Sequence, residues 1–119
     1  MNIENNTATE LNADNVKAQM RKGVLEYCIL SILRKGPSYA SPMIAQLKKA
    51  QMIVVEGTLY PLLTRLKNQE FLSYKWEESP SGPPRKYYSL TAKGLESLNL
   101  MDEAWGEVVK TVELIKTGI

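Results

Sequence analysis

The spacing of apolar residues changes twice along the chain, and the order of these changes restricts the fold more than any other feature. Steps of three and four residues, typical of helices, run through residues 16–66. Aromatic-rich, strand-like segments follow at residues 71–76 and 86–90, on either side of the turn-forming stretch SPSGPP. Helical spacing returns from residue 91. The chain is therefore predicted to be α+β and mostly α, with a hairpin between helices and a long final helix.

The first two helices are read from their apolar stripe and their end signals. Residues 16–33 predict one helix that is buried over much of its circumference and stops at Gly36-Pro37. The second helix is expected to begin with Ser41 as its N-cap and a proline in the first turn. Its apolar residues, Ile44 and Leu47, face inward.

Four leucines define the third helix and leave a polar face on its other side. The leucines are Leu59, Leu62, Leu63 and Leu66. Pro61 is expected in the first turn, where its missing N–H would be unpaired anyway. The polar face carries Thr58, Tyr60, Thr64, Arg65, Lys67 and Asn68. A polar face of this kind can enter the major groove of DNA. Three helices followed by a hairpin, with a polar face on the third helix, therefore predict a winged helix-turn-helix.

The final helix has Thr91 as its expected N-cap and carries a heptad seam. The seam consists of Leu98, Met101, Trp105, Val108, Val112 and Ile115. Because it is short for a free coiled coil, pairing with a second copy of the chain explains it better. The expected organisation is a flexible arm at 1–15, a DNA-binding domain at 16–90 and a dimerisation helix at 91–119.

Composition narrows the class of protein further. With 119 residues, the chain fits one domain, and no apolar run reaches the length of a membrane span. The polar N-terminus has no secretory pattern, so a cytoplasmic location is expected. Cys28 lies in an apolar run and is interpreted as a buried small hydrophobe. The chain has no histidine and no catalytic or metal-binding motif, so neither an enzyme, a cofactor nor a metal is expected.

Charge is distributed unevenly around a net value of +2. Residues 16–94 hold 13 bases and 5 acids, whereas residues 95–119 hold 2 bases and 5 acids. A basic middle section suits a module that binds phosphates, and an acidic final helix suits a protein contact.

Two blocks, GTLYPLLTRL at 57–66 and GPPRKYYSLTAKG at 82–94, resemble the PadR-type transcriptional regulators. The resemblance extends upstream through RKGVLEYCILSILRKGPSYA, and the single long last helix looks most like the short subfamily of LmrR-type multidrug-sensing repressors. Two departures are Ser41, where a further aromatic is frequent, and Glu70, where glycine is usual. Without that glycine a different exit from the third helix is expected.

The resemblance implies a homodimer that binds a roughly palindromic double-stranded DNA operator and represses transporter or detoxification genes. The third-helix contacts to DNA would be Thr58, Tyr60, Thr64, Arg65 and Lys67, with Tyr60 favoured among them. Arg85 and Lys86, expected at the tip of the hairpin, could reach phosphates or the minor groove. The hydroxyl of Tyr39 could donate a hydrogen bond to a phosphate, although the sequence favours a half-buried packing role for this tyrosine nearly as well.

Trp105 has two readings, because in a two-fold dimer its copy would lie close by. It could be a tryptophan of the dimer core, or two indoles could sandwich a planar aromatic inducer, as the resemblance to LmrR-type repressors implies. Met101, Val108, Val16 and Met20 would then be candidate walls of the pocket. For the whole chain, the alternative to a DNA-binding repressor is a winged-helix module that binds a protein and not DNA.

Overall fold

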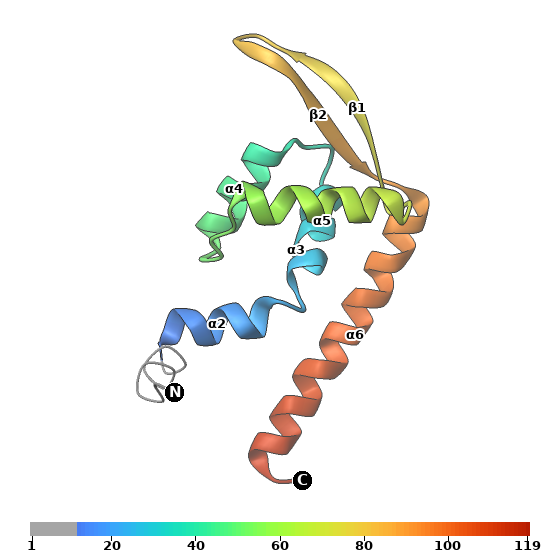
Figure 1. Cartoon of the computed structure of the whole chain (residues 1–119). Helices are drawn as coiled ribbons and strands as arrows, with labels where there is room; N and C mark the ends of the chain where they lie inside the picture. The colour runs from blue at the N-terminus through green and yellow to red at the C-terminus, as the bar shows by residue number, and fades with distance from the viewer. Residues whose placement is uncertain (1–11) are drawn as a thin grey trace.

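The computed structural model describes residues 12–119, which form five helices and a two-stranded antiparallel sheet (Figure 1). In chain order the elements are α2 (Ala13–Arg21), α3 (Leu25–Arg34), α4 (Ala40–Lys49), α5 (Glu56–Asn68), β1 (Leu72–Ser79), β2 (Gly82–Leu90) and α6 (Ala92–Thr117). The mostly helical α+β class, with a hairpin before a long final helix, is confirmed. No helix within residues 12–119 is long and apolar enough to cross a membrane.

The prediction of a flexible arm at 1–15 is wrong for residues 13–15, which belong to a helix. Residues 1–11 lie outside the described part of the chain, but α2 already begins at Ala13. The side chain of Asn12 caps this helix by accepting hydrogen bonds from the backbone N–H groups of Asp14 and Asn15. An asparagine N-cap satisfies donors that have no partner inside a helix, and this explains the early start.

The single helix predicted over residues 16–33 is wrong, because the chain breaks it into α2 and α3 around Gly23. A glycine in a helix interior costs about 1 kcal/mol relative to alanine, which makes this the weakest point of the apolar stripe. After the break, α2 runs away from the helices of the core (Figure 1). Val16 and Met20 of the predicted stripe therefore stay exposed in one copy of the chain.

Both helices that follow begin before the predicted residues. The N-cap of α4 is Tyr39 and not Ser41. Because α5 begins at Glu56, Pro61 lies in its second turn, and the expectation of a first-turn proline is wrong. Pro61 cannot donate to the carbonyl of Gly57, but both residues are exposed, so water can satisfy this oxygen.

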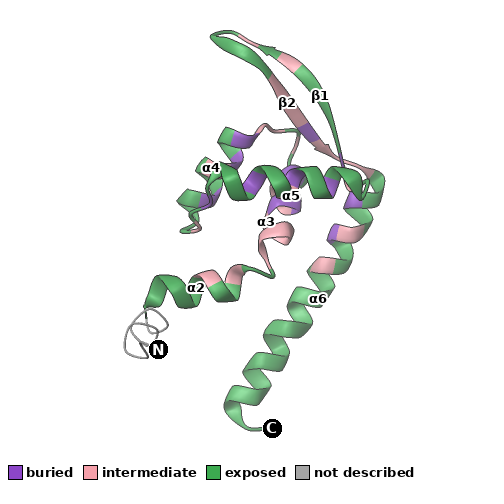
Figure 2. Ribbon diagram, viewed as in Figure 1, coloured by how far each residue is buried: buried purple, intermediate pink, exposed green. Residues whose placement is uncertain are grey.

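One apolar core joins α3, α4, α5, the base of the hairpin and the start of α6 (Figure 2). Its buried residues are Ile29, Leu30, Leu33, Ala40, Met43, Leu47, Val54, Leu59, Leu63, Leu66, Leu72, Tyr88 and Leu98. The inward leucines predicted for the third helix are confirmed, with Leu62 partly buried. Cys28 packs against this core, and burial raises the pKa of its thiol, which disfavours the reactive thiolate.

The hairpin is longer than predicted, and its turn is reduced to Pro80-Ser81. Its far end projects beyond the helices of the core (Figure 1). At its base, Ser38 pairs with Tyr88 through two backbone hydrogen bonds of 2.8 and 3.1 Å. Tyr88 is buried and Tyr87 is only partly buried, as expected of neighbouring residues on opposite faces of a strand.

Thr91 is the N-cap of α6, as predicted, and its side chain joins three segments. Its Oγ1 accepts a hydrogen bond from the N–H of Gly94 (2.9 Å) and donates one to the carbonyl of Glu70 (2.6 Å), while its N–H donates to the carbonyl of Phe71 (3.1 Å). A Cβ on Gly94 would lie 2.1 Å from the Phe71 carbonyl oxygen. Only a glycine lets α6 approach the chain between α5 and β1 so closely.

The predicted seam on α6 divides into two parts. Leu98 is fully buried in the core of its own chain, so its assignment to the dimer interface is wrong. Met101 is partly buried against the same core. Beyond it, the helix extends free of the core, and Trp105, Val108 and the later seam residues are exposed (Figure 2).

The exit from α5 is the usual one despite the missing glycine. Glu70 has a φ of 67°, in the left-handed region, and its N–H bonds to the carbonyl of Lys67. The N–H of Phe71 reaches back to the carbonyl of Leu66 at 3.0 Å, as in a Schellman-type helix end. The expected different exit is therefore wrong: tertiary contacts hold a glutamate in the conformation that glycine normally provides.

Replacing Glu70 by glycine should raise the free energy of unfolding by about 1 kcal/mol, because a left-handed non-glycine residue costs about that amount. Urea denaturation followed by circular dichroism measures the change. Gln69→Gly is the matched control, since Gln69 has a φ of −79° and a glycine there relieves no strain. Equal destabilisation by both substitutions would contradict the interpretation of Glu70 as strained.

Candidate nucleic-acid interface and adjoining pocket

The exposed side chains of α5 point in three different directions. Thr64 lines a groove between α5 and the hairpin, together with Tyr60. Arg65 instead points toward α3, where its Nη1 lies 3.7 Å from the carboxylate of Glu26. Lys67 lies toward the hairpin, with its Nζ 5.9 Å from the ring centroid of Tyr74. The six polar residues predicted on this face thus do not all point the same way.

Thr58 and Asn68 complete the exposed face of α5. Gly57 lies beside Thr58 in the first turn of α5, and a Cβ on Gly57 would meet only open space. Small side chains at the N-terminal end of a helix allow it to approach the floor of a DNA groove closely. Tyr60 and Thr64, further along the helix, can then donate and accept hydrogen bonds at base edges.

The groove beside α5 has a volume of about 820 Å³ and is bounded by α5, the start of α4 and the hairpin. Its charged lining residues are Arg85 and Lys86, and no carboxylate lines it among residues 12–119. The groove is therefore suited in charge to a phosphate backbone.

Arg85 and Lys86 were predicted at the tip of the hairpin, but they lie within β2. The guanidinium of Arg85 stacks 4.4 Å from the ring centroid of Tyr39. Lys86 lies on the other face of the strand, 4.6 Å from the ring centroid of Tyr74. Both side chains are half-buried, because the strand is longer than its sequence indicated and aromatic rings hold the cations against it.

Tyr39 lies at the entrance to α4, in contact with the hairpin. Its ring centroid is 5.1 Å from that of Tyr87, and the side chain is partly exposed along the groove. Both readings left open by the sequence are thus compatible with its position, since one ring can pack on the hairpin and still present its hydroxyl at the groove.

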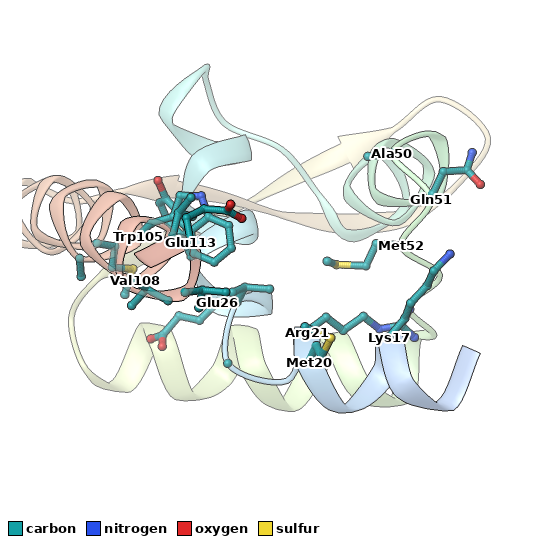
Figure 3. Close-up of a pocket in the computed structure, with 17 residues that line it drawn as sticks. Lys17, Met20, Arg21, Glu26, Ala50, Gln51, Met52, Trp105, Val108 and Glu113 are labelled. Atoms are coloured by element: carbon teal, nitrogen blue, oxygen red, sulfur yellow. The ribbon is translucent and has the colours of Figure 1, made fainter. Parts of the chain in front are cut away.

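A second hollow, of about 810 Å³, lies between α2, α3, the end of α4 and α6 (Figure 3). Four of the five predicted pocket residues line it: Met20, Met101, Trp105 and Val108. Val16 does not line the hollow, because it lies on another part of the exposed surface of α2. Trp105 and Val108 lie at one end of the hollow, and Met20 lies at the other with Met52 (Figure 3).

Sequence reasoning missed the charged and aromatic groups of this hollow. Glu26 and Glu113 lie near Trp105, whereas Lys17 and Arg21 lie beside Met20 (Figure 3). Tyr27 lines the hollow too, with its ring centroid 6.3 Å from that of Trp105. These residues come from separate helices, so no local spacing could have indicated that they meet. Within residues 12–119, no group of three potential metal ligands is present.

A hydrogen-bonded network fastens α3 to α6 next to Trp105. The hydroxyl of Tyr27 donates to Asp102 at 2.5 Å, and Arg34 donates to the other carboxylate oxygen at 2.7 Å. The pKa of Asp102 is lowered, mainly by the hydrogen bond from Tyr27 and next by the hydrogen bond from Arg34. The hydrogen bond between Tyr27 and Asp102 also raises the pKa of Tyr27. The network therefore stays intact at neutral pH.

A helix with an exposed polar face, next to a groove lined by cations and a projecting hairpin, defines a winged-helix DNA-binding protein. A model of the transcriptional regulator PadR-like family matches residues 29–100, and the chain belongs to this family. Proteins of the family bind DNA and typically dimerise.

Solved structures agree with this assignment. A PadR-like transcription factor from Bacteroides fragilis is 61% identical, with 85% of this chain and 98% of that chain covered and a TM-score of 0.72. A PadR-like regulator from Bacillus cereus is 40% identical, with coverage of 85% and 99% and a TM-score of 0.75. A PadR family regulator from Eggerthella lenta is 30% identical, with coverage of 89% and 93% and a TM-score of 0.81.

Removing the hydroxyl of Tyr27 in the variant Tyr27→Phe should raise the pKa of Asp102 toward its ordinary value, leaving it lowered only by Arg34. A lowered carboxyl pKa contributes stability above the ordinary pKa of the group, and this contribution is lost as the pH falls through the lowered value. Carboxyl ¹³C NMR titration measures the pKa directly. Tyr87→Phe, on the far side of the core, is the control, and an unchanged Asp102 pKa in Tyr27→Phe would disprove the link.

Proposed function

We propose that this regulator is a homodimeric repressor that binds a roughly palindromic operator through α5 and the hairpin and responds to a planar aromatic ligand. The observation that carries the proposal is the separation of two surfaces. The polar face of α5 and the cationic groove lie at one side, and the exposed apolar residues of α6 lie away from them on the free part of that helix.

The exposed part of α6 favours a second copy of the chain as its partner. Trp105, Val108, Val112 and Ile115 are all exposed by more than two fifths of their surface, along one stripe of the helix. A stripe of this length is costly in water and is buried efficiently by its own symmetry mate. A two-fold dimer would place two α5 helices about one turn of DNA apart, roughly 34–36 Å, as a palindrome requires.

The DNA contacts proposed are Tyr39, Thr58, Tyr60, Thr64, Arg65, Lys67, Arg85 and Lys86. Their positions support different roles. Tyr60 and Thr64 line the groove and would reach bases, whereas Arg85 and Lys86 would neutralise phosphates beside it. Arg65 must leave Glu26 or share its charge before it reaches DNA, so its contact would be weaker. Surface ion pairs are worth at most about 1 kcal/mol, so this exchange is affordable.

The hollow beside Trp105 is the proposed ligand site, and it is open in a single copy of the chain. A dimer that brings two Trp105 side chains together would close it with a second indole face. Such a ligand changes DNA affinity only if it prefers one dimer geometry over another. The hydrogen bond from Tyr27 to Asp102 joins α6 to α3. A shift of α6 at Trp105 would therefore displace Tyr27 and the part of α3 that packs in the core.

Tyr60→Ala should weaken binding to the protein's own promoter fragment by roughly tenfold or more, since a good base contact is worth about 1–3 kcal/mol. Lys86→Gln should weaken binding to any fragment and reduce the dependence of log affinity on log salt by about one unit. Fluorescence anisotropy with promoter and scrambled fragments at several salt concentrations measures both effects.

The control for the DNA experiment is Lys110→Gln, which removes an exposed lysine from α6, far along the helix from the groove. It should retain the affinity and the salt dependence of the wild-type protein. Wild-type binding that is weak, unselective and insensitive to salt would contradict the operator-binding function and favour a protein partner.

Trp105→Ala should abolish binding of a planar aromatic dye such as proflavine, because it removes the indole against which the dye would stack. Isothermal titration calorimetry without DNA measures the affinity. Trp76→Ala, which removes the chain's other tryptophan, is the control and should leave dye binding unchanged. Equal dye affinity in Trp105→Ala and the wild-type protein would eliminate this hollow as the ligand site.

A further inference from the structure

The hairpin carries an exposed tryptophan, Trp76, which is not among the proposed DNA contacts. The pairing of the strands places Trp76 opposite Lys86 and Tyr74 opposite Tyr88. Residues directly opposite each other in an antiparallel pair have side chains on the same face, so these four share one face of the hairpin. At the base of the hairpin, the same face carries Leu72, which is buried in the core.

Exposure increases steadily along this face toward the far end of the hairpin. Along β1, Leu72 is 2% exposed, Tyr74 is 37% exposed and Trp76 is 61% exposed. Scattered exposed apolar residues need no explanation, but an indole at the end of a continuous aromatic row is different. The row carries an apolar surface from the core out to where the hairpin projects.

Neighbouring groups hold the indole in place. The ring of Tyr74 meets it edge to face at a centroid distance of 6.3 Å. The ammonium of Lys86 lies 5.3 Å from the centroid of Trp76 and 4.6 Å from that of Tyr74. An aromatic side chain restrained in this way loses little conformational entropy when it contacts a partner.

The face that carries Trp76 takes part in lining the groove beside α5. Trp76 lines this groove together with Tyr60 and Thr64 of α5, and with the basic residue Lys86. The groove has no carboxylate lining it within residues 12–119, so its charge favours a polyanion over a protein helix. A nucleic-acid backbone between α5 and the hairpin would therefore run past the indole.

We propose that Trp76 is a DNA contact of this regulator, packing its indole against the sugars of the strand that passes between α5 and the hairpin. The proposal rests on the DNA-binding function proposed above. The contact is apolar and faces the backbone, so it adds affinity without selecting a base sequence. Lys86 beside it supplies the charge that meets the adjacent phosphate, and the two side chains act as a pair.

This contact has a thermodynamic signature that separates it from a phosphate contact. Trp76→Ala should weaken binding about tenfold on promoter and scrambled fragments alike, with the salt dependence unchanged because no charge is removed. Lys86→Gln should instead reduce the salt dependence. Trp76→Phe should retain most of the affinity, and it controls for folding together with the thermal unfolding midpoint of each variant.

A direct measurement uses wild-type sequence labelled with 5-fluorotryptophan, whose two ¹⁹F resonances are assigned by the loss of one in Trp76→Phe. The Trp76 resonance should shift on addition of DNA and saturate at the binding stoichiometry. Wild-type affinity in Trp76→Ala, or a Trp76 resonance that stays in place at saturating DNA, would overturn the proposal. Absence of DNA binding by the wild-type protein would instead overturn the proposed function, so the two failures are distinguishable.

Discussion

The arrangement of the whole molecule depends on one close approach, that of Gly94 to the carbonyl of Phe71. At this point α6 crosses the short segment that leads from α5 to β1, with Thr91 bonded to both Glu70 and Phe71. A methyl group at Gly94 would push α6 away from this segment. Because α6 leaves the domain here, the crossing sets the angle between the free half of α6 and the face of α5. In a dimer joined through α6, that angle would decide how far apart two α5 helices lie.

Helix α3 contacts both candidate functional surfaces. Glu26 lies near Arg65 of α5, and the next residue, Tyr27, bonds to Asp102 and contacts Trp105 on α6. Neither the ion pair nor the exposed hydrogen bond is strong by itself. Their adjacency on one rigid helix nevertheless means that a movement of α6 and a movement of α5 both act on α3. This is a physical route for coupling, and it becomes regulation only if a ligand prefers one arrangement.

Much of the fold could be predicted because local patterns and tertiary structure agree. The inward leucines of α5 follow from periodicity, and the N-cap at Thr91 follows from capping chemistry. The errors have a common cause, which is competition between local signals and distant contacts. Gly23 interrupts a stripe that looked continuous, and Glu70 adopts a conformation that its side chain disfavours. The candidate DNA face was predictable as a set of residues, but not the turning of Arg65 toward α3.

The sequence by itself determined the hairpin between α5 and the long final helix, the family, the polar face of α5 and the apolar stripe of α6, since each depends on residue types at short, regular spacing. Only the tertiary structure decided which of these residues meet. Leu98 entered its own core instead of an interface, Trp76 came to face the groove beside α5, and Tyr27 found a partner 75 residues away in Asp102. The physical reason is that such contacts depend on how helices cross, and that crossing is fixed by steric contacts between residues far apart in the chain.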